Sequence, residues 1–380
     1  MDVRNTTHGK HRRRSTHRLL AVAVGVVVLA GLAVAAVLWT RGTGSPHGAG
    51  QAASSTPHGT AAQRSATRTP SAPAASSATP TADPPVAVGK APHFIAVAPG
   101  GRFAYIADAG AGAVFRFDTA TATVTATITI PQAPPQMLTF SPDGRRAYVS
   151  AYTADFGTDY LVTIDTATDT PTAALAVGRG PYAAATTPDG RLLYLPYYDE
   201  THLDVMDTTT GAMVAQIPAA PCPHWIVFTR DGRFAYTTNH FSNVVTVLAI
   251  PQNTVVTTIP VGSGPHSLEM SPDGSRIAVV DYAGDDVRLI DPASNTVVGT
   301  VPAVGAGPQD VTYAPDGKHL YTANVNDGTV SVVDVATGAV TARIPTGASP
   351  TSIAVTPDGR RAFVTNFDDG NVRPLGTAVG

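Results

Sequence analysis

The tetrapeptide SPDG at residues 141–144 decides the fold, because close copies of it recur along the chain. The copies are APGG (98–101), TPDG (187–190), TRDG (229–232), SPDG (271–274), APDG (314–317) and TPDG (356–359). Their closing glycines lie 43, 46, 42, 42, 43 and 42 residues apart. A repeat of about 42 residues with strand patterning on both sides of a turn is typical of a β-propeller. The spacing therefore predicts an all-β, seven-bladed β-propeller.

The sixth repeat shows how one unit forms a blade. Pro315 presets the backbone of its turn, and Gly317 accepts the backbone angle that such a turn requires. The strands are expected at residues 309–313, 319–324, 329–334 and 339–344. Apolar and polar side chains alternate in the third of them, as in a half-buried strand. Four antiparallel strands per repeat make one propeller blade.

Motifs at the ends of the second strands point to a known repeat family. They read YIAD (105–108), YTTN (236–239), YTAN (321–324) and FVTN (363–366), and LVTIDTAT (161–168) and VGSGP (261–265) accompany them. Residues 86–380 therefore resemble the YVTN family of β-propeller repeats, of the lactonase-like superfamily, with local departures in the fourth and fifth units. The resemblance implies an extracytoplasmic scaffold of surface-layer or periplasmic type, and it carries no catalytic residues.

The seventh repeat has no room for a fourth strand after its third. We expect residues 85–89 (PVAVG), which precede the first repeat, to supply that outer strand. A ring closed in this way leaves no unpaired sheet edge. The propeller domain is therefore predicted to span residues 85–380.

The first 84 residues have a different composition. Residues 1–18 carry six Lys or Arg, and residues 19–38 contain no polar side chain. Such a run is long enough to cross a bilayer core of about 30 Å, and the basic residues before it favour a cytoplasmic N-terminus. We predict a cytoplasmic tail (1–18), a transmembrane signal-anchor helix (19–40) and a disordered Ser/Thr/Ala/Pro-rich linker (41–84). The alternative is a cleaved signal peptide.

Charge and cysteine content exclude several classes of function. Residues 85–380 hold 16 basic and 26 acidic residues, so the predicted propeller is acidic and has no basic face for nucleic acid. Cys222 is the one cysteine, so neither an intrachain disulfide nor a multi-cysteine metal site can form. The expected location of the propeller is outside the cell, on a single-pass membrane anchor.

A propeller has two faces, and the sequence distinguishes them. The turn face carries the repeated tetrapeptides, whose aspartates we expect only to build turns. The loop face carries the loops that join the second to the third strand and the fourth strand to the next blade, and these loops vary. One residue per blade follows a proline at the channel mouth on this face: His93, Gln136, Tyr182, His224, His266, Gln309 and Thr351.

Three of those residues are candidate ligands of a divalent metal. His224, His266 and His93 could together supply a three-imidazole site. In a seven-fold ring, however, His93 faces the other two across the channel. Glu269 lies about 10 Å deeper on its inner strand, too far to share an ion with His266. The competing interpretation is that these histidines form hydrogen bonds with neighbouring loops.

Aromatic residues gather on the loop face of the second to fifth blades, beside several carboxylates. The candidate ligand-binding residues are Tyr182, Tyr197, Tyr198, Trp225, His240 and Tyr282. Rings beside carboxylates suit glycans, peptides or cationic ligands through stacking, hydrogen bonds and cation–π contacts. The competing interpretation is that about half of these rings fill space between blades.

Together these features favour a binding or interaction module over an enzyme. The expected ligand is a glycan, peptide or protein of the cell envelope or its surroundings, and no cofactor is expected apart from the candidate metal. A metal-assisted hydrolase or lyase of lactonase-like type is the first alternative, and a structural surface protein is the second. The sequence contains no nucleophile elbow or phosphate-binding loop.

Overall fold

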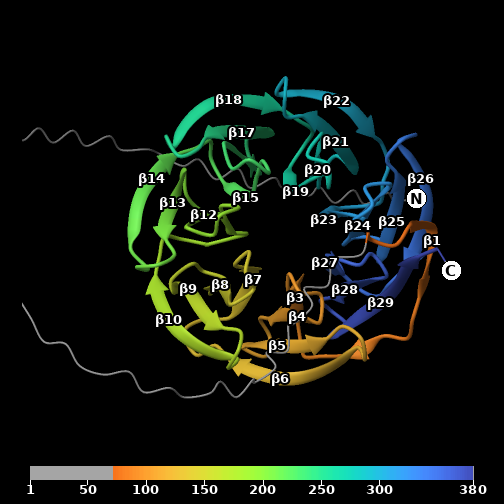
Figure 1. Cartoon of the computed structure of the whole chain (residues 1–380), viewed down its shortest axis with the longest axis horizontal. Helices are drawn as coiled ribbons and strands as arrows, with labels where there is room; N and C mark the ends of the chain where they lie inside the picture. The colour runs from red at the N-terminus through yellow and green to blue at the C-terminus, as the bar shows by residue number, and fades with distance from the viewer. Residues whose placement is uncertain (1–71, 380) are drawn as a thin grey trace, which may run out of the picture. The chain divides into compact units, whose positions relative to one another are not determined.

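Seven antiparallel sheets surround a central channel in the computed structural model, which describes residues 72–379 (Figure 1). Each sheet has its first strand beside the channel and its last strand on the outer rim. Blades are numbered here in chain order. The seven-bladed all-β fold predicted from the repeat spacing is confirmed, with four antiparallel strands in each complete blade.

The strands follow one another in sequence within each blade. Blade 1 holds β3 (Pro92–Val97), β4 (Phe103–Asp108), β5 (Ala113–Asp118) and β6 (Thr123–Thr129); blade 2 holds β7 (Pro135–Phe140), β8 (Arg146–Tyr152), β9 (Asp159–Asp165) and β10 (Thr170–Ala176). Blade 3 holds β11 (Ala185–Thr186), β12 (Leu192–Pro196), β13 (His202–Asp207) and β14 (Met213–Pro218); blade 4 holds β15 (Pro223–Phe228), β16 (Phe234–Asn239), β17 (Val244–Ala249) and β18 (Thr254–Pro260). Blade 5 holds β19 (Pro265–Met270), β20 (Ile277–Asp281), β21 (Asp286–Asp291) and β22 (Thr296–Val301); blade 6 holds β23 (Pro308–Tyr313), β24 (His319–Asn324), β25 (Thr329–Asp334) and β26 (Ala339–Pro345).

The repeated tetrapeptide forms the turn between the first two strands of a blade. In blade 2, Gly144 has φ +68° and its N–H donates to the carbonyl of Ser141 at 2.8 Å. The carboxylate of Asp143 accepts from the Ser141 hydroxyl at 2.6 Å and from the Arg145 N–H at 3.0 Å. These hydrogen bonds lower the pKa of Asp143, as expected for a carboxylate that builds its own turn.

Tyrosines of the second strands connect neighbouring blades through the core. Tyr194 and Tyr236 are fully buried, and their hydroxyls donate to Asn253 at 2.6 Å and to Asn295 at 2.7 Å, each in the outer hairpin of the next blade. The ring fills the space between two sheets while its polar tip finds a partner. The motif tyrosine is therefore a packing residue between blades.

Blade 7 closes the ring by two N-terminal strands, of which the sequence predicted only the shorter one. Its strands β27 (Pro350–Val355), β28 (Arg361–Asn366) and β29 (Asn371–Ala378) are completed by β1 (Ser76–Ala82), and β2 (Val86–Ala87) also pairs with β29 (Figure 1). The sequence placed this strand at residues 85–89 and assigned 76–82 to a disordered linker. Closure by an N-terminal segment is confirmed, and β2 lies within the predicted residues 85–89, but the longer closing strand, β1, lies in the segment that was assigned to the linker.

Hydrogen bonds of Ser76 explain why the closing strand begins at residue 76. Its N–H donates to Asp316 at 2.7 Å, and its hydroxyl lies 2.8 Å from Asp316 and 2.6 Å from His319 Nδ1, both in blade 6. Only Ser76 and Pro80 of β1 are buried, because outer strands face solvent. A strand that buries so little gives no hydrophobic pattern in the sequence.

Residues 72–379 contain no helix that is long and apolar enough to span a membrane. The predicted transmembrane helix (19–40) and the cytoplasmic tail (1–18) lie outside the described residues.

Candidate functional site

A pocket of about 270 Å³ opens on the loop face at the mouth of the channel. Its lining comes from blades 3 to 6, which is the part of the ring where the sequence places the aromatic side chains. The lining residues are Tyr182, Tyr198, His224, His240, His266, Tyr282 and Gln309. Seven cyclic or amide side chains surround the space, and no carboxylate or ammonium group lines it.

Tyr182 precedes the inner strand of blade 3, β11, which is reduced to two residues. Before that strand, Pro181 pairs with Tyr197, and the Tyr182 N–H donates to the Pro196 carbonyl at 2.9 Å. Ala183 instead forms a parallel bridge with Trp225 of blade 4, where its N–H donates to the carbonyl of His224 at 3.3 Å. The ring of Tyr182 then lies 3.8 Å from that of His224, measured between centroids.

Three imidazoles lie against one another in the pocket. The ring centroids of His224 and His266 are 4.2 Å apart, and those of His240 are 5.2 Å and 5.6 Å from them. His224 and His266 are 1% and 7% exposed. Burial, together with mutual repulsion of the charged forms, lowers the pKa of both rings well below the ordinary value, so they are neutral at pH 7.

The neutral imidazoles leave hydrogen-bonding capacity unused. Neither nitrogen of His224, nor Nδ1 of His266, has a hydrogen-bond partner. His240 Nδ1 lies 3.3 Å from the carbonyl of Pro265, which can only accept, so Nδ1 carries the proton and Nε2 is the acceptor. Buried polar atoms without partners are costly and rare in folded proteins. These nitrogens are themselves buried, so a ligand would contact them only once the rings turn toward the pocket.

Tyrosines form the walls of the pocket. The ring of Tyr198 lies 5.4 Å from His224, and that of Tyr282 lies 6.1 Å from His266. Phe241, which is 64% exposed, extends this aromatic surface beyond Tyr198, with the centroids 5.5 Å apart. A ligand in the pocket would thus meet flat π-faces as well as imidazole nitrogens.

Not every predicted ligand-binding residue lies here. Tyr197 is fully buried, and its hydroxyl donates to Asp204 at 2.7 Å within blade 3, so it faces the core. Trp225 lines the channel below the pocket, where its ring meets that of Phe94 from blade 1 at 5.5 Å. Blades 1 and 4 lie on opposite sides of the ring, so this pair of rings spans the channel.

The predicted metal ligands are only partly brought together. His224 and His266 are in contact, but the third imidazole beside them is His240 rather than His93. His93 lies near Gln309, with 3.5 Å between Nε2 atoms, and near the ring of Phe367 at 5.8 Å. Across residues 72–379, no three His, Cys, Asp or Glu side chains are arranged to hold a metal ion.

The fold and the pocket define a seven-bladed β-propeller with one aromatic, histidine-containing site at the channel mouth. Residues 150–298 match the family model described as "Lactonase, 7-bladed beta-propeller", and residues 278–377 match that of the "Cytochrome D1 heme domain". Neither match reaches half of the chain, and neither model is the YVTN repeat, so that resemblance stays a prediction. No curated protein matches the sequence.

Among solved structures, a chain of Kuenenia stuttgartiensis hydrazine synthase is similar to this one. The two superpose with a TM-score of 0.69 and 22% sequence identity, over 78% of this chain and 98% of that chain. At this identity the likeness shows the shared propeller fold. Propellers host many unrelated functions, so the site must be argued from its own residues.

The second family model raises the question of whether haem fits this chain. The only histidine in residues 278–377 is His319, which is buried and bound to Ser76 rather than facing the channel. The loop-face pocket, at about 270 Å³, is below the range of about 300–1,000 Å³ that drug-sized ligands occupy, and a tetrapyrrole needs more space. The loop-face pocket therefore does not fit haem.

Proposed function

We propose that this propeller is a binding module that takes a small, neutral, hydroxyl-rich ligand in the loop-face pocket. A sugar ring of a cell-envelope glycan has the matching chemistry. The observation that carries the proposal is the pair of buried, neutral imidazoles, His224 and His266, in a pocket walled by tyrosines, with both nitrogens of His224 and Nδ1 of His266 lacking partners.

The lining explains why a sugar suits the pocket better than an ion. Hydroxyl groups both donate and accept, which matches an imidazole that has one N–H and one free nitrogen. The C–H faces of a pyranose pack on aromatic rings such as Tyr198 and Tyr282. No formal charge lines the pocket at pH 7, so a charged ligand would be desolvated there without a partner.

Glycan binding by the purified full-length protein tests the proposal. Tyr198 is half-buried in the pocket wall, and Tyr198→Ala should weaken binding by about 1–3 kcal/mol, which is roughly 5- to 150-fold. Phe367→Ala is the matched control, because Phe367 is a half-buried aromatic residue on the loop face of blade 7 and does not line the pocket. A glycan array without any binder, or equal losses in both variants, would refute the proposal.

We also propose that the module is displayed outside the cell by the apolar segment 19–40. The support is the sequence alone: a basic stretch precedes the apolar run, as is typical of a cytoplasmic N-terminus. Protease added to intact cells should release a soluble propeller. Protection of the propeller until the cells are lysed would show the opposite orientation.

A metal-assisted hydrolase or lyase is the second candidate. Its support is that the lactonase model covers residues 150–298, which include His224, His240 and His266. Binding of an ion would require these rings to turn their nitrogens toward one point. A stoichiometric metal in the purified protein, together with lactone hydrolysis that chelation abolishes, would favour this candidate over the binding module.

A further inference from the structure

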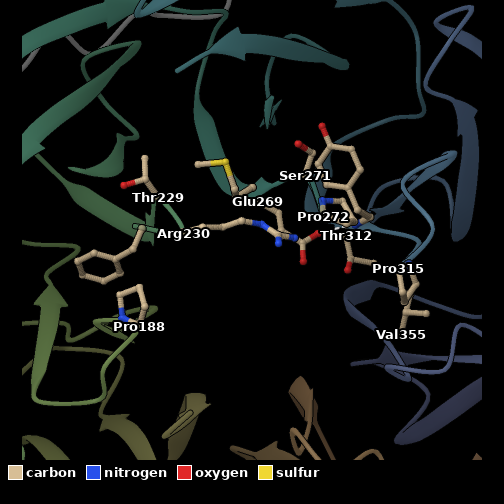
Figure 2. A pocket seen from close by; sticks show the side chains of 12 residues that line it. Pro188, Thr229, Arg230, Glu269, Ser271, Pro272, Thr312, Pro315 and Val355 are labelled. Atoms are coloured by element: carbon tan, nitrogen blue, oxygen red, sulfur yellow. Dashed lines mark hydrogen bonds between the residues drawn. The ribbon is translucent and has the colours of Figure 1, made fainter. Parts of the chain in front are cut away.

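A larger cavity lies at the opposite end of the channel from the histidine pocket. It has a volume of about 640 Å³ and opens on the turn face, between the inner turns of blades 3 to 6. Figure 2 shows Arg230 extending into it from the blade 4 turn, toward the side that carries Glu269 and Thr312. Neither Arg230 nor Glu269 lines the loop-face pocket.

Arg230 stands where the other repeats have proline. In six of the seven inner turns this position is proline, and each proline ring faces the closing glycine of the next blade, as Pro188 faces Gly232. The aliphatic carbons of Arg230 face Gly274 in the same way. The side chain therefore retains the packing of the repeat and adds a guanidinium group at the mouth of the cavity.

The guanidinium is not neutralised by the surrounding protein. Within residues 72–379 Arg230 forms no ion pair. No turn aspartate lines the cavity, because each is held in its own turn. Asp231, the nearest in sequence, accepts from the Thr229 hydroxyl at 2.6 Å and from the Arg233 N–H at 3.0 Å. An exposed, unpaired arginine with five N–H donors is suited to bind a carboxylate or a phosphate.

Glu269 is the second departure from the repeat pattern. The corresponding inner-strand positions hold alanine, threonine or valine, so Glu269 is the only ionisable residue at this level of the channel. One of its carboxyl oxygens accepts the Tyr313 N–H. Burial, with a smaller contribution from the charge of Asp310, raises the pKa of Glu269 to about 8, which leaves it mostly protonated at pH 7. A protonated carboxyl donates a hydrogen bond, as Arg230 does.

We propose that the turn-face cavity is a second ligand site, which binds a small organic anion through a carboxylate or phosphate group held by Arg230, with Glu269 donating a further hydrogen bond. The ionisable groups around Glu269 are Asp310 and Tyr313 on β23, and Arg230 across the cavity. Asp310 accepts from the Ser352 hydroxyl at 2.9 Å and the Ile353 N–H at 3.0 Å, and it does not line this cavity.

The test is titration of the full-length protein with succinate and, separately, with inorganic phosphate, followed by calorimetry at low ionic strength. Arg230→Pro is the informative variant, because it restores the residue of the other six turns and should fold. We expect it to weaken binding at least about tenfold, as for the loss of a charge-assisted pair. Glu269→Gln keeps a donor at this position and should bind as the wild type does. Whichever probe binds more tightly identifies the anionic group.

Binding at the turn-face cavity should not depend on the loop-face pocket. Tyr198→Ala should leave succinate and phosphate binding unchanged, and Arg230→Pro should leave glycan binding unchanged. The proposal is overturned if neither anion binds the wild type, if Arg230→Pro binds both anions as well as the wild type does, or if the cavity takes a cation such as choline instead.

Discussion

Ser76 is predicted to hold the ring closed, and replacing it by alanine tests how. The change removes the hydroxyl that lies 2.8 Å from Asp316 and 2.6 Å from His319 Nδ1, but it keeps the N–H bond to Asp316 at 2.7 Å. A hydrogen bond to a charged group contributes about 1.5–3 kcal/mol, and a buried acceptor left without a partner costs about 1–3 kcal/mol. Because part of this cost is relieved by relaxation, we expect Ser76→Ala to lower the free energy of unfolding by about 2–4 kcal/mol.

Thermal unfolding followed by circular dichroism measures this effect. For a domain of about 300 residues, 1 kcal/mol corresponds to about 1.6 °C in Tm, so a fall of roughly 3–6 °C is expected. Hydrogen exchange should quicken in β1 before other strands, because the outer strand would detach first. Ser76→Thr keeps a hydroxyl and should retain most of the stability.

Ser77→Ala is the matched control for this experiment. The Ser77 hydroxyl is partly exposed and only accepts the Thr79 N–H at 3.1 Å, so its loss should change stability by less than about 0.5 kcal/mol. If Ser76→Ala melts within a degree of the wild type, and if exchange in β1 is unchanged, then Ser76 does not anchor the closing strand.

Three further predictions concern the core and the pH dependence of stability. Tyr197→Phe should lower the free energy of unfolding by about 1–2 kcal/mol through loss of the bond to Asp204, and glycan binding should be unchanged; weaker binding would place Tyr197 in the site. Burial lowers the pKa of His224 and His266, so below about pH 6.5 the unfolded chain binds more protons than the folded one, and these two rings should destabilise the fold on acidification; from pH 7 to 5 the Tm of a variant with His224→Gln and His266→Gln should rise relative to that of the wild type, and a constant difference between the two would refute the cause. Glu269 has the opposite sign, because its raised pKa makes the folded state bind the extra proton, so its contribution to stability should be lost as the pH rises from about 4.5 to 8, and the Tm of the wild type should fall relative to that of Glu269→Gln over this range; parallel pH profiles would refute the protonated carboxyl.

The repeat spacing was sufficient to predict the blades, because each tetrapeptide has one structural solution. Gly144 needs a positive φ and Asp143 needs donors in its own turn, and both needs are met locally. The residues that follow the inner prolines could also be placed at the channel mouth. Tyr182, His224, His266 and Gln309 do meet there.

Other parts of the site depend on geometry that a repeat does not encode. Tyr197 and Tyr198 are adjacent at the end of β12, and which of them faces the core depends on the register of that strand. The parallel bridge between Ala183 of blade 3 and Trp225 of blade 4 has no sequence signature either. A readable signal was nevertheless present at Arg230, where one arginine replaces a proline found in six other turns.

The closing strand was missed for a physical reason. Outer strands are exposed, so β1 (Ser76–Ala82) has the small, polar composition that also characterises a linker. What identifies it is a set of hydrogen bonds to Asp316 and His319, some 240 residues away in the sequence. Contacts at that separation cannot be inferred from local pattern.

The most direct test of the central claim is a nitrogen-15 NMR titration of full-length protein labelled at histidine, using the tightest-binding glycan from the array. The imidazole signals of His224 and His266 should shift on saturation, because their unpartnered nitrogens are the proposed contacts. The signal of His319, which is bound to Ser76 outside the pocket, should stay in place. Unchanged signals of His224 and His266 at saturation would contradict the proposed site.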